Sequence, residues 1–185
     1  MVTNVARSPL ARTATRDRLN VRHLADIAGY WMASAGIYLT YGLLFFYSAK
    51  EKLFTDEGTM PAGLAKAYHG TFIASFPGTN TSWLLVGLME AAVFLAIAAS
   101  VIRGEFLPTR RKPILLSALG LSMFTFAIIA WGENITSEFA TVSELFQYLV
   151  GTAVLIVFVM LMPPYRKMAW LSGLLQRGDR EQEQE

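Results

Sequence analysis

Four long apolar windows constrain the fold of this chain more than any other feature of its sequence. They cover residues 28–49, 82–102, 113–131 and 142–162. Each holds about 20 residues, the length with which an α-helix crosses a hydrocarbon core roughly 30 Å thick. In lipid a helix satisfies its backbone polar groups within its own segment. The windows therefore predict an all-α integral membrane protein, a bundle of four transmembrane helices.

The basic residues predict how this bundle is oriented. Of the 16 Lys and Arg residues, 13 lie in the arm before the first window, in the connector between the second and third windows, and in the tail. The other three are Lys50, Lys52 and Lys66. Because basic residues collect on the cytoplasmic side, both termini are expected in the cytoplasm, with the protein in the inner or plasma membrane of the cell.

Hydropathy divides the chain into three parts. Residues 1–27 are expected to form a basic cytoplasmic arm, of which 1–20 are loose unless a partner orders them, and residues 28–162 the transmembrane domain. Residues 163–185 are expected to be a cytoplasmic interfacial helix with a polar tail. In the first outer loop, apolar residues recur every four positions, which predicts an amphipathic helix on the outer surface or dipping between the helices as a short lid. These residues are Leu64, Tyr68, Phe72 and Phe76.

Composition excludes several kinds of chemistry. The chain has no Cys, so it has no disulfide and no thiolate metal site. His23 and His69 both lie outside the apolar windows, which excludes bis-His haem ligation within the membrane. No metal-ligand cluster or hydrolase triad is recognisable, and a net charge of +2 does not indicate a nucleic-acid partner. Whether the protein is an enzyme stays open at this point.

Glu90 is the most informative single residue. It lies about eight positions into the second window, roughly 12 Å below the outer interface at 1.5 Å per residue. An ionisable group at that depth usually faces the interior of the bundle and is paired, neutral or beside water. Glu90 is therefore a candidate proton relay. The alternative is structural, an ion pair or hydrogen bond that ties the second helix to the first.

Four further polar residues fall in the same outer half of the membrane. Lys50 and Lys52 close the first helix, and either could turn inward toward Glu90 or anchor the helix end in lipid head groups. Glu144 and Gln147 open the fourth helix and share one face, although Glu144 also suits a helix N-terminus electrostatically. Together they predict a candidate pocket for a quinone or lipid head group.

Part of the chain resembles a known family. The stretch Tyr-Gly-Leu-Leu-Phe-Phe-Tyr-Ser-Ala-Lys-Glu-Lys-Leu-Phe at residues 41–54 is similar to the first-helix signature of the DoxX-like superfamily of small four-helix membrane proteins. Trp83, Gly87 and Glu90 resemble its second-helix pattern, in which Glu follows Gly by three residues. The resemblance covers about residues 38–104, and the second half matches only in hydropathy. It implies a compact bundle linked to quinone-coupled oxidation, with polar positions at Lys50 or Lys52 and at Glu90.

Two functions follow as expectations. The first is a quinone-linked redox membrane subunit, with no covalently bound cofactor and with electrons supplied by a partner or directly by substrate. The second is a non-catalytic accessory subunit of a larger respiratory or transport complex, favoured by the basic arm and the tail. A small transporter is a weaker third reading. The expected partners are the lipid bilayer and other membrane subunits, and a homo-oligomer is compatible with the sequence.

Overall fold

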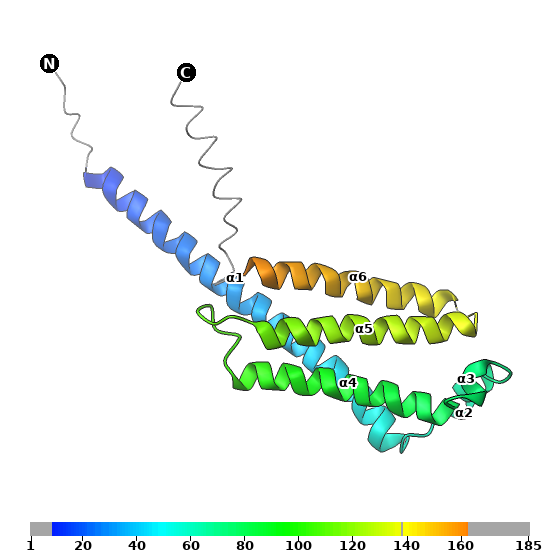
Figure 1. Cartoon of the computed structure of the whole chain (residues 1–185). Helices are drawn as coiled ribbons and strands as arrows, with labels where there is room; N and C mark the ends of the chain where they lie inside the picture. Colours follow the sequence, from blue (N-terminus) through cyan, green and yellow to red (C-terminus); the bar gives the residue numbers. More distant parts are fainter. Residues whose placement is uncertain (1–8, 138, 163–185) are drawn as a thin grey trace, which may run out of the picture. The chain divides into compact units, whose positions relative to one another are not determined.

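The structure, a computed structural model, describes residues 9–137 and 139–162, with side-chain surroundings from residue 27 onward. These residues form helices and the turns that connect them, and include no strand. The helices are α1 (Pro9–Lys50), which continues as a π-helical turn η1 (Glu51–Thr55), α2 (Ala62–Ala67), α3 (Phe72–Ser75), α4 (Thr79–Ile102), α5 (Pro113–Ile135) and α6 (Phe139–Leu161) (Figure 1). The expected interfacial helix after residue 162 lies outside the described residues.

Four of these helical segments are long and apolar enough to cross a membrane. They are Ile27–Thr55, Thr79–Ile102, Pro113–Ile135 and Phe139–Leu161. At 1.5 Å per residue, a helix of 23 or 24 residues is about 35 Å long, which exceeds the thickness of the hydrocarbon core. The prediction of an all-helical chain with four such segments is confirmed.

The conformation of the N-terminal arm differs from the one expected from the sequence. The chain divides into two compact units, Met1–Leu39 and Thr40–Glu185. In the first unit α1 already begins at Pro9, so the prediction of a loose arm is wrong for residues 9–20. No Gly interrupts this stretch and its one Pro stands at the first helical position, where proline is tolerated. Helix can therefore propagate outward from the apolar segment.

In the second unit, α5 packs against both α4 and α6 (Figure 1). The part of α1 within this unit joins them through a buried polar contact and an aromatic one. The Tyr41 and Thr152 hydroxyl oxygens are 2.6 Å apart, and Thr152 donates to the Tyr148 carbonyl at 2.7 Å. Since a hydroxyl has one proton to give, Tyr41 is the donor to Thr152. Phe45, only 1% exposed, packs on the ring of Phe126 with centroids 5.5 Å apart.

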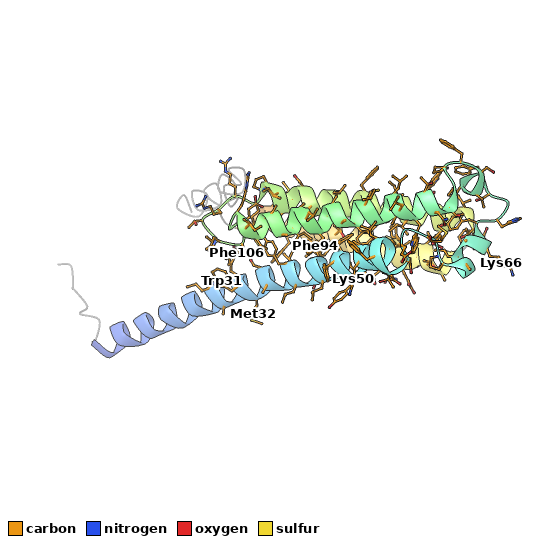
Figure 2. The ribbon with its side chains drawn as sticks, turned by 90° about the horizontal axis from the view of Figure 1, so that it is seen from below. Trp31, Met32, Lys50, Lys66, Phe94 and Phe106 are labelled. Atoms are coloured by element: carbon orange, nitrogen blue, oxygen red, sulfur yellow. The ribbon has the colours of Figure 1, made fainter. Side chains whose placement is uncertain are left out.

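The outward faces of this unit are apolar. Side chains such as Leu95, Phe124 and Val154 are each about 60% exposed (63%, 59% and 62%). Figure 2 shows carbon-rich side chains projecting from the helices along their length. A soluble protein rarely exposes apolar surface so extensively, whereas lipid-facing helices require it. This surface supports the assignment to a membrane.

The hydroxyl groups of α5 donate hydrogen bonds to carbonyl groups of the same helix. Ser117 donates to the Pro113 carbonyl at 2.9 Å, and Ser122 and Thr125 donate to carbonyls three and four residues earlier. Such bonds satisfy a hydroxyl without a second helix or a ligand. These bonds indicate a structural role for the three residues.

The connector between α4 and α5 contains a buried carboxylate that sequence reasoning missed. Glu105 is 4% exposed and accepts hydrogen bonds from the backbone N–H groups of Ile114 and Leu115, at 3.1 and 2.9 Å, and from the Ser100 hydroxyl at 2.9 Å. The first N–H groups of a helix lack partners within it, and a negative charge is favourable there. Glu105 therefore caps α5 from eight residues upstream of Pro113.

Candidate functional site

A buried ion pair joins the end of the first spanning segment to α4. The Lys52 ammonium lies 3.0 Å from Oε2 of Glu90 and donates a hydrogen bond of 3.1 Å to Oε1. It also donates to the Ser48 hydroxyl at 2.8 Å and lies 4.8 Å from the centroid of the Trp83 ring. The side chains of Lys52 and Glu90 are 11% and 4% exposed. Partners on several sides compensate the ammonium, as a charge buried in a membrane requires.

The local helix geometry turns Lys52 inward. Tyr41, Phe45, Ser48 and Lys52 follow the spacing of one helical face, and Lys52 extends the buried stripe by one turn. Lys50 is two residues away, about 200° around the helix at 100° per residue, and is exposed. Lys52 itself stands within the π-helical turn, a rare geometry that often occurs at functional positions.

Gly87 allows the two segments to approach each other at this point. A Cβ atom on Gly87 would lie 3.0 Å from Cβ of Lys52 and 3.1 Å from Cδ2 of Leu53. A side chain at this position would therefore require the π-helical turn to shift by a few tenths of an ångström. Trp83, Gly87 and Glu90 are spaced as i, i+4 and i+7, so this face of α4 carries the cation-binding ring, the gap and the carboxylate.

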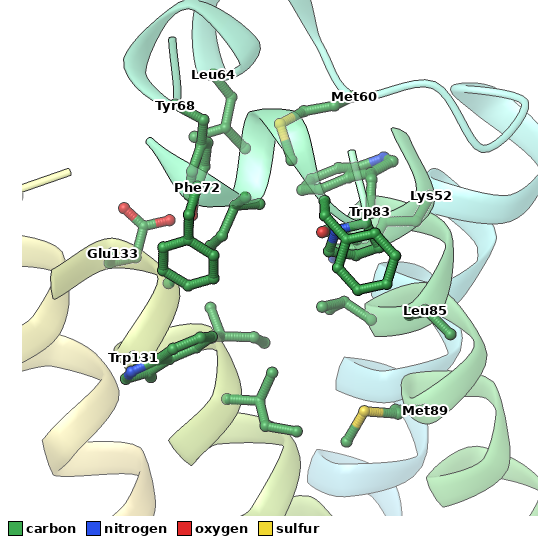
Figure 3. A pocket seen from close by; sticks show the side chains of 18 of the residues that line it. Lys52, Met60, Leu64, Tyr68, Phe72, Trp83, Leu85, Met89, Trp131 and Glu133 are labelled. Atoms are coloured by element: carbon green, nitrogen blue, oxygen red, sulfur yellow. The ribbon is translucent and has the colours of Figure 1, made fainter. Parts of the chain in front are cut away.

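A pocket of about 830 Å³ opens beside the ion pair, with Lys52 in its wall. Most of its walls are apolar or aromatic (Figure 3). The lining comes from Lys52, from the connector between η1 and α4, from the first half of α4 and from the end of α5. The described residues that line the pocket are Lys52, Met60, Leu64, Tyr68, Phe72, Ile73, Ser75, Phe76, Pro77, Ser82, Trp83, Leu85, Val86, Met89, Ile128, Ile129, Trp131, Gly132 and Glu133. This volume lies in the range of small-molecule sites.

The connector covers one end of this pocket. All four residues of the amphipathic stripe, Leu64, Tyr68, Phe72 and Phe76, line it. The stripe is not one helix as expected, because Gly70 adopts a φ of 85° between α2 and α3 and ends the helical run. Met60, Tyr68 and Ile73 form a small buried cluster that holds the two short helices together.

Two polar side chains stand on the α5 side of the pocket. Tyr68 is 7% exposed, and its hydroxyl oxygen lies 3.0 Å from the place that a Cβ atom on Gly132 would take. Burial raises the pKa of Tyr68 to about 12, and the neighbouring Glu133 carboxylate adds to this rise. The Tyr68 phenol therefore keeps its proton at ordinary pH. Figure 3 places Tyr68 and Glu133 across the pocket from Lys52 and Trp83.

The indole nitrogen of Trp83 is a buried donor without an acceptor among the described residues. Buried N–H groups are nearly always hydrogen-bonded, and one left unpaired costs about 1–3 kcal/mol. Trp83 lines the pocket, so an acceptor inside it is one way to satisfy this group. In the sequence Trp83 was singled out as part of the second-helix resemblance, and not as a hydrogen-bond donor.

The structure separates the five residues predicted to converge. It brings together Lys52 and Glu90, and Glu90 lies behind Lys52, outside the pocket wall formed by the described residues. Lys50, Glu144 and Gln147 are exposed and do not line this pocket. Lys50 does not line the pocket because it lies about 200° around the helix from Lys52. Glu144 and Gln147 project from α6, whereas α4 and α5 supply the helical walls.

Other sequence candidates have no place in the pocket. His69 is exposed on the connector, as expected of a solvated side chain. Within residues 9–137 and 139–162, no group of three or more His, Cys, Asp and Glu residues is arranged to hold a metal ion. Comparisons with family models, with curated proteins and with solved structures each find no match to this chain.

Proposed function

We propose that this protein binds a neutral, lipophilic molecule of the quinone class in the pocket beside Lys52, as a quinone-linked subunit of a membrane redox system. The observation that carries the proposal is an apolar pocket of about 830 Å³ whose wall contains a cation compensated by a buried carboxylate. Such a wall offers a strong hydrogen-bond donor without an excess positive charge. Carbonyl oxygens of a neutral ring fit this combination.

The residues of the pocket support a head group placed near α4. The Lys52 ammonium and the unpartnered Trp83 indole N–H are both donors, and both belong to residues of the wall. A carbonyl oxygen would satisfy the Trp83 nitrogen. A bound quinone supplies two-electron redox chemistry coupled to proton uptake. Lys52 would hold the carbonyl, and Glu90 would position Lys52 and relay protons through it.

The open side of the pocket suits a ligand dissolved in the bilayer. Leu85, Phe72 and Trp131 line the pocket and are nevertheless 50%, 57% and 55% exposed. Deeper along the same walls, Met89 of α4 and Ile128 of α5 continue the apolar lining. An isoprenoid or alkyl tail could therefore extend from the pocket into lipid. With no Cys and two His in the chain, we assign the electrons to a partner or to the oxidised substrate.

Substitution of Lys52 tests this proposal. In Lys52→Gln the cationic donor is lost, so a decyl-substituted 1,4-benzoquinone should bind at least about tenfold more weakly in detergent micelles. Binding is measured through quenching of tryptophan fluorescence, since Trp83 and Trp131 line the pocket. The matched control is Lys50→Gln, an exposed lysine two residues away, which should bind like the wild type.

A double variant separates binding from folding. Lys52→Gln alone leaves the Glu90 carboxylate buried without its partner, which is strongly destabilising. Lys52→Gln with Glu90→Gln removes both charges and should restore the unfolding temperature but not the affinity. Equal quinone affinity in this double variant and the wild type would refute the role of Lys52, and no binding to the wild type would refute the proposal itself.

The accessory-subunit alternative is supported by a different feature, the length of α1. This helix has 42 residues, roughly twice the about 20 residues that cross a bilayer core. The sequence of this excess contains Arg12, Arg16, Arg18 and Arg22, and we propose an acidic partner surface as their counterpart. Recovery of larger subunits with the protein from mild detergent, without bound quinone, would favour this alternative.

A further inference from the structure

The pocket has a second polar side, which the function proposed above does not use. Lys52 and Trp83 occupy one side, and Tyr68 and Glu133 occupy the other (Figure 3). Aromatic and aliphatic side chains, among them Phe72 and Val86, make up much of the remaining wall. A ring bound in this pocket would therefore meet hydrogen-bonding groups at two edges.

The Tyr68 hydroxyl is a donor with no acceptor of its own. It makes no hydrogen bond to another described residue, although the side chain is only 7% exposed. Gly132 provides the room for this group, because a Cβ there would lie 3.0 Å from the hydroxyl oxygen. A phenol is protonated at neutral pH, and burial with the nearby Glu133 carboxylate raises the pKa of Tyr68 further, to about 12, so the hydroxyl acts as a donor toward a carbonyl oxygen.

The charges around the pocket disfavour anionic ligands. Glu90 compensates the positive charge of Lys52 at 3.0 Å. Because this pair is neutral overall, the wall near α4 offers a phosphate or carboxylate head group no excess positive charge to compensate its own. A neutral head group needs no such compensation. Lipid phosphates and fatty acids are thus poorer candidates than neutral rings with hydrogen-bond acceptors.

We propose that the Tyr68 hydroxyl donates a hydrogen bond to a second acceptor on the ligand, so that the pocket selects neutral head groups with acceptors on two opposite edges. This inference rests on the proposed function, since Lys52 and Trp83 hold the first acceptor. Among quinones it selects the para arrangement, in which the two carbonyl groups point in opposite directions. Tyr68 is then a specificity-determining residue, contributed by the connector between η1 and α4.

Two probes of similar size test the inference. A decyl-substituted 1,4-benzoquinone has two opposite carbonyl oxygens, and a decyl-substituted phenyl ketone has one. The wild type should bind the quinone about three- to tenfold more tightly than the ketone, the usual effect of one neutral hydrogen bond. Tyr68→Phe should abolish this preference by weakening the quinone alone. The control Tyr47→Phe removes an exposed hydroxyl outside the pocket and should keep the preference.

A second variant guards against a folding defect in Tyr68→Phe. Gly132→Ala keeps the phenol but displaces its hydroxyl, and should also remove the preference for the quinone. If the wild type prefers the quinone and both variants retain that preference, Tyr68 is not the second donor, while the proposed function stands. If the wild type binds neither probe, the proposed function itself fails. Binding of decyl phosphate as tight as that of the quinone would overturn the argument from charge.

Discussion

At the scale of single residues, the site depends on which of two neighbouring lysines faces the protein. Lys50 and Lys52 are equally basic and lie two positions apart, yet only Lys52 reaches Glu90, at 3.0 Å. The hydroxyl of Ser48, one turn earlier, and the ring of Trp83 complete its surroundings. A buried cation with this many partners has little freedom to reorient, so it can present one N–H direction to a ligand.

Gly87 makes this arrangement possible, and its substitution gives a prediction. In Gly87→Ala the new methyl group would meet Cβ of Lys52 at 3.0 Å, so the free energy of unfolding should fall by about 1–3 kcal/mol. Quinone affinity should fall as well, because Lys52 is displaced. Thermal unfolding in detergent measures the first effect.

Gly120→Ala is the matched control, since no atom lies within 4 Å of its Cβ position on α5. Alanine favours helix over glycine, so this variant should be as stable as the wild type or slightly more stable. Equal unfolding temperatures for Gly87→Ala and Gly120→Ala would show that the close approach at Gly87 is unimportant.

Part of the site could be predicted from the residues alone. The depth of Glu90 in an apolar window indicated a buried, paired carboxylate, and the phase of Tyr41, Phe45 and Ser48 could have chosen Lys52 over Lys50. The four-residue period of the connector indicated a lid as one alternative, but the position of Tyr68 beside Glu133 could not be predicted, because it depends on how the connector folds back over two helices. No periodicity in one segment reports such a contact.

At the scale of elements, the spanning helices followed directly from hydropathy, whereas the connectors did not. Long apolar runs have one solution in lipid, so the bounds of α4, α5 and α6 were predicted to within four residues, whereas α1 begins 19 residues before its window. The connector between α4 and α5 depends on single contacts, such as the Glu105 carboxylate at the N-terminus of α5. In the sequence Glu105 is one charged residue in a basic loop, and nothing there indicates its burial.

The cap gives a prediction for this connector. Glu105→Ala leaves the N–H groups of Ile114 and Leu115 and the Ser100 hydroxyl without this acceptor, so the free energy of unfolding should fall by about 1–3 kcal/mol. Hydrogen exchange at Ile114 and Leu115 should increase. Glu51→Ala, at an exposed position, is the control and should change neither quantity. Unaltered exchange in Glu105→Ala would contradict the capping role.

At the scale of the whole molecule, the distribution of charge gives the protein two unlike ends. The connector between α4 and α5 carries Arg103, Arg110, Arg111 and Lys112, whereas the connector between η1 and α4 carries Lys66 beside Asp56 and Glu57. We infer from the positive-inside rule that the first connector is cytoplasmic and the second faces outward. The pocket would then lie in the outer half of the membrane.

Because the chain has no cysteine, this orientation can be tested with single reporters. His69→Cys and Thr109→Cys place a thiol at an exposed position on each connector. A membrane-impermeant maleimide added to intact cells should label the cysteine at position 69, and should label that at position 109 only after permeabilisation. Labelling of position 109 in intact cells would reverse the assigned orientation.

The pairing of Lys52 with Glu90 also bears on how the protein would respond to an energised membrane. A single elementary charge moved across a membrane potential of 100 mV gains or loses about 2.3 kcal/mol. Two opposite charges held 3.0 Å apart cancel nearly all of that work, and a neutral ligand adds none. Occupancy of the pocket would consequently be the same in polarised and depolarised cells, set by the amount of ligand in the lipid and not by voltage.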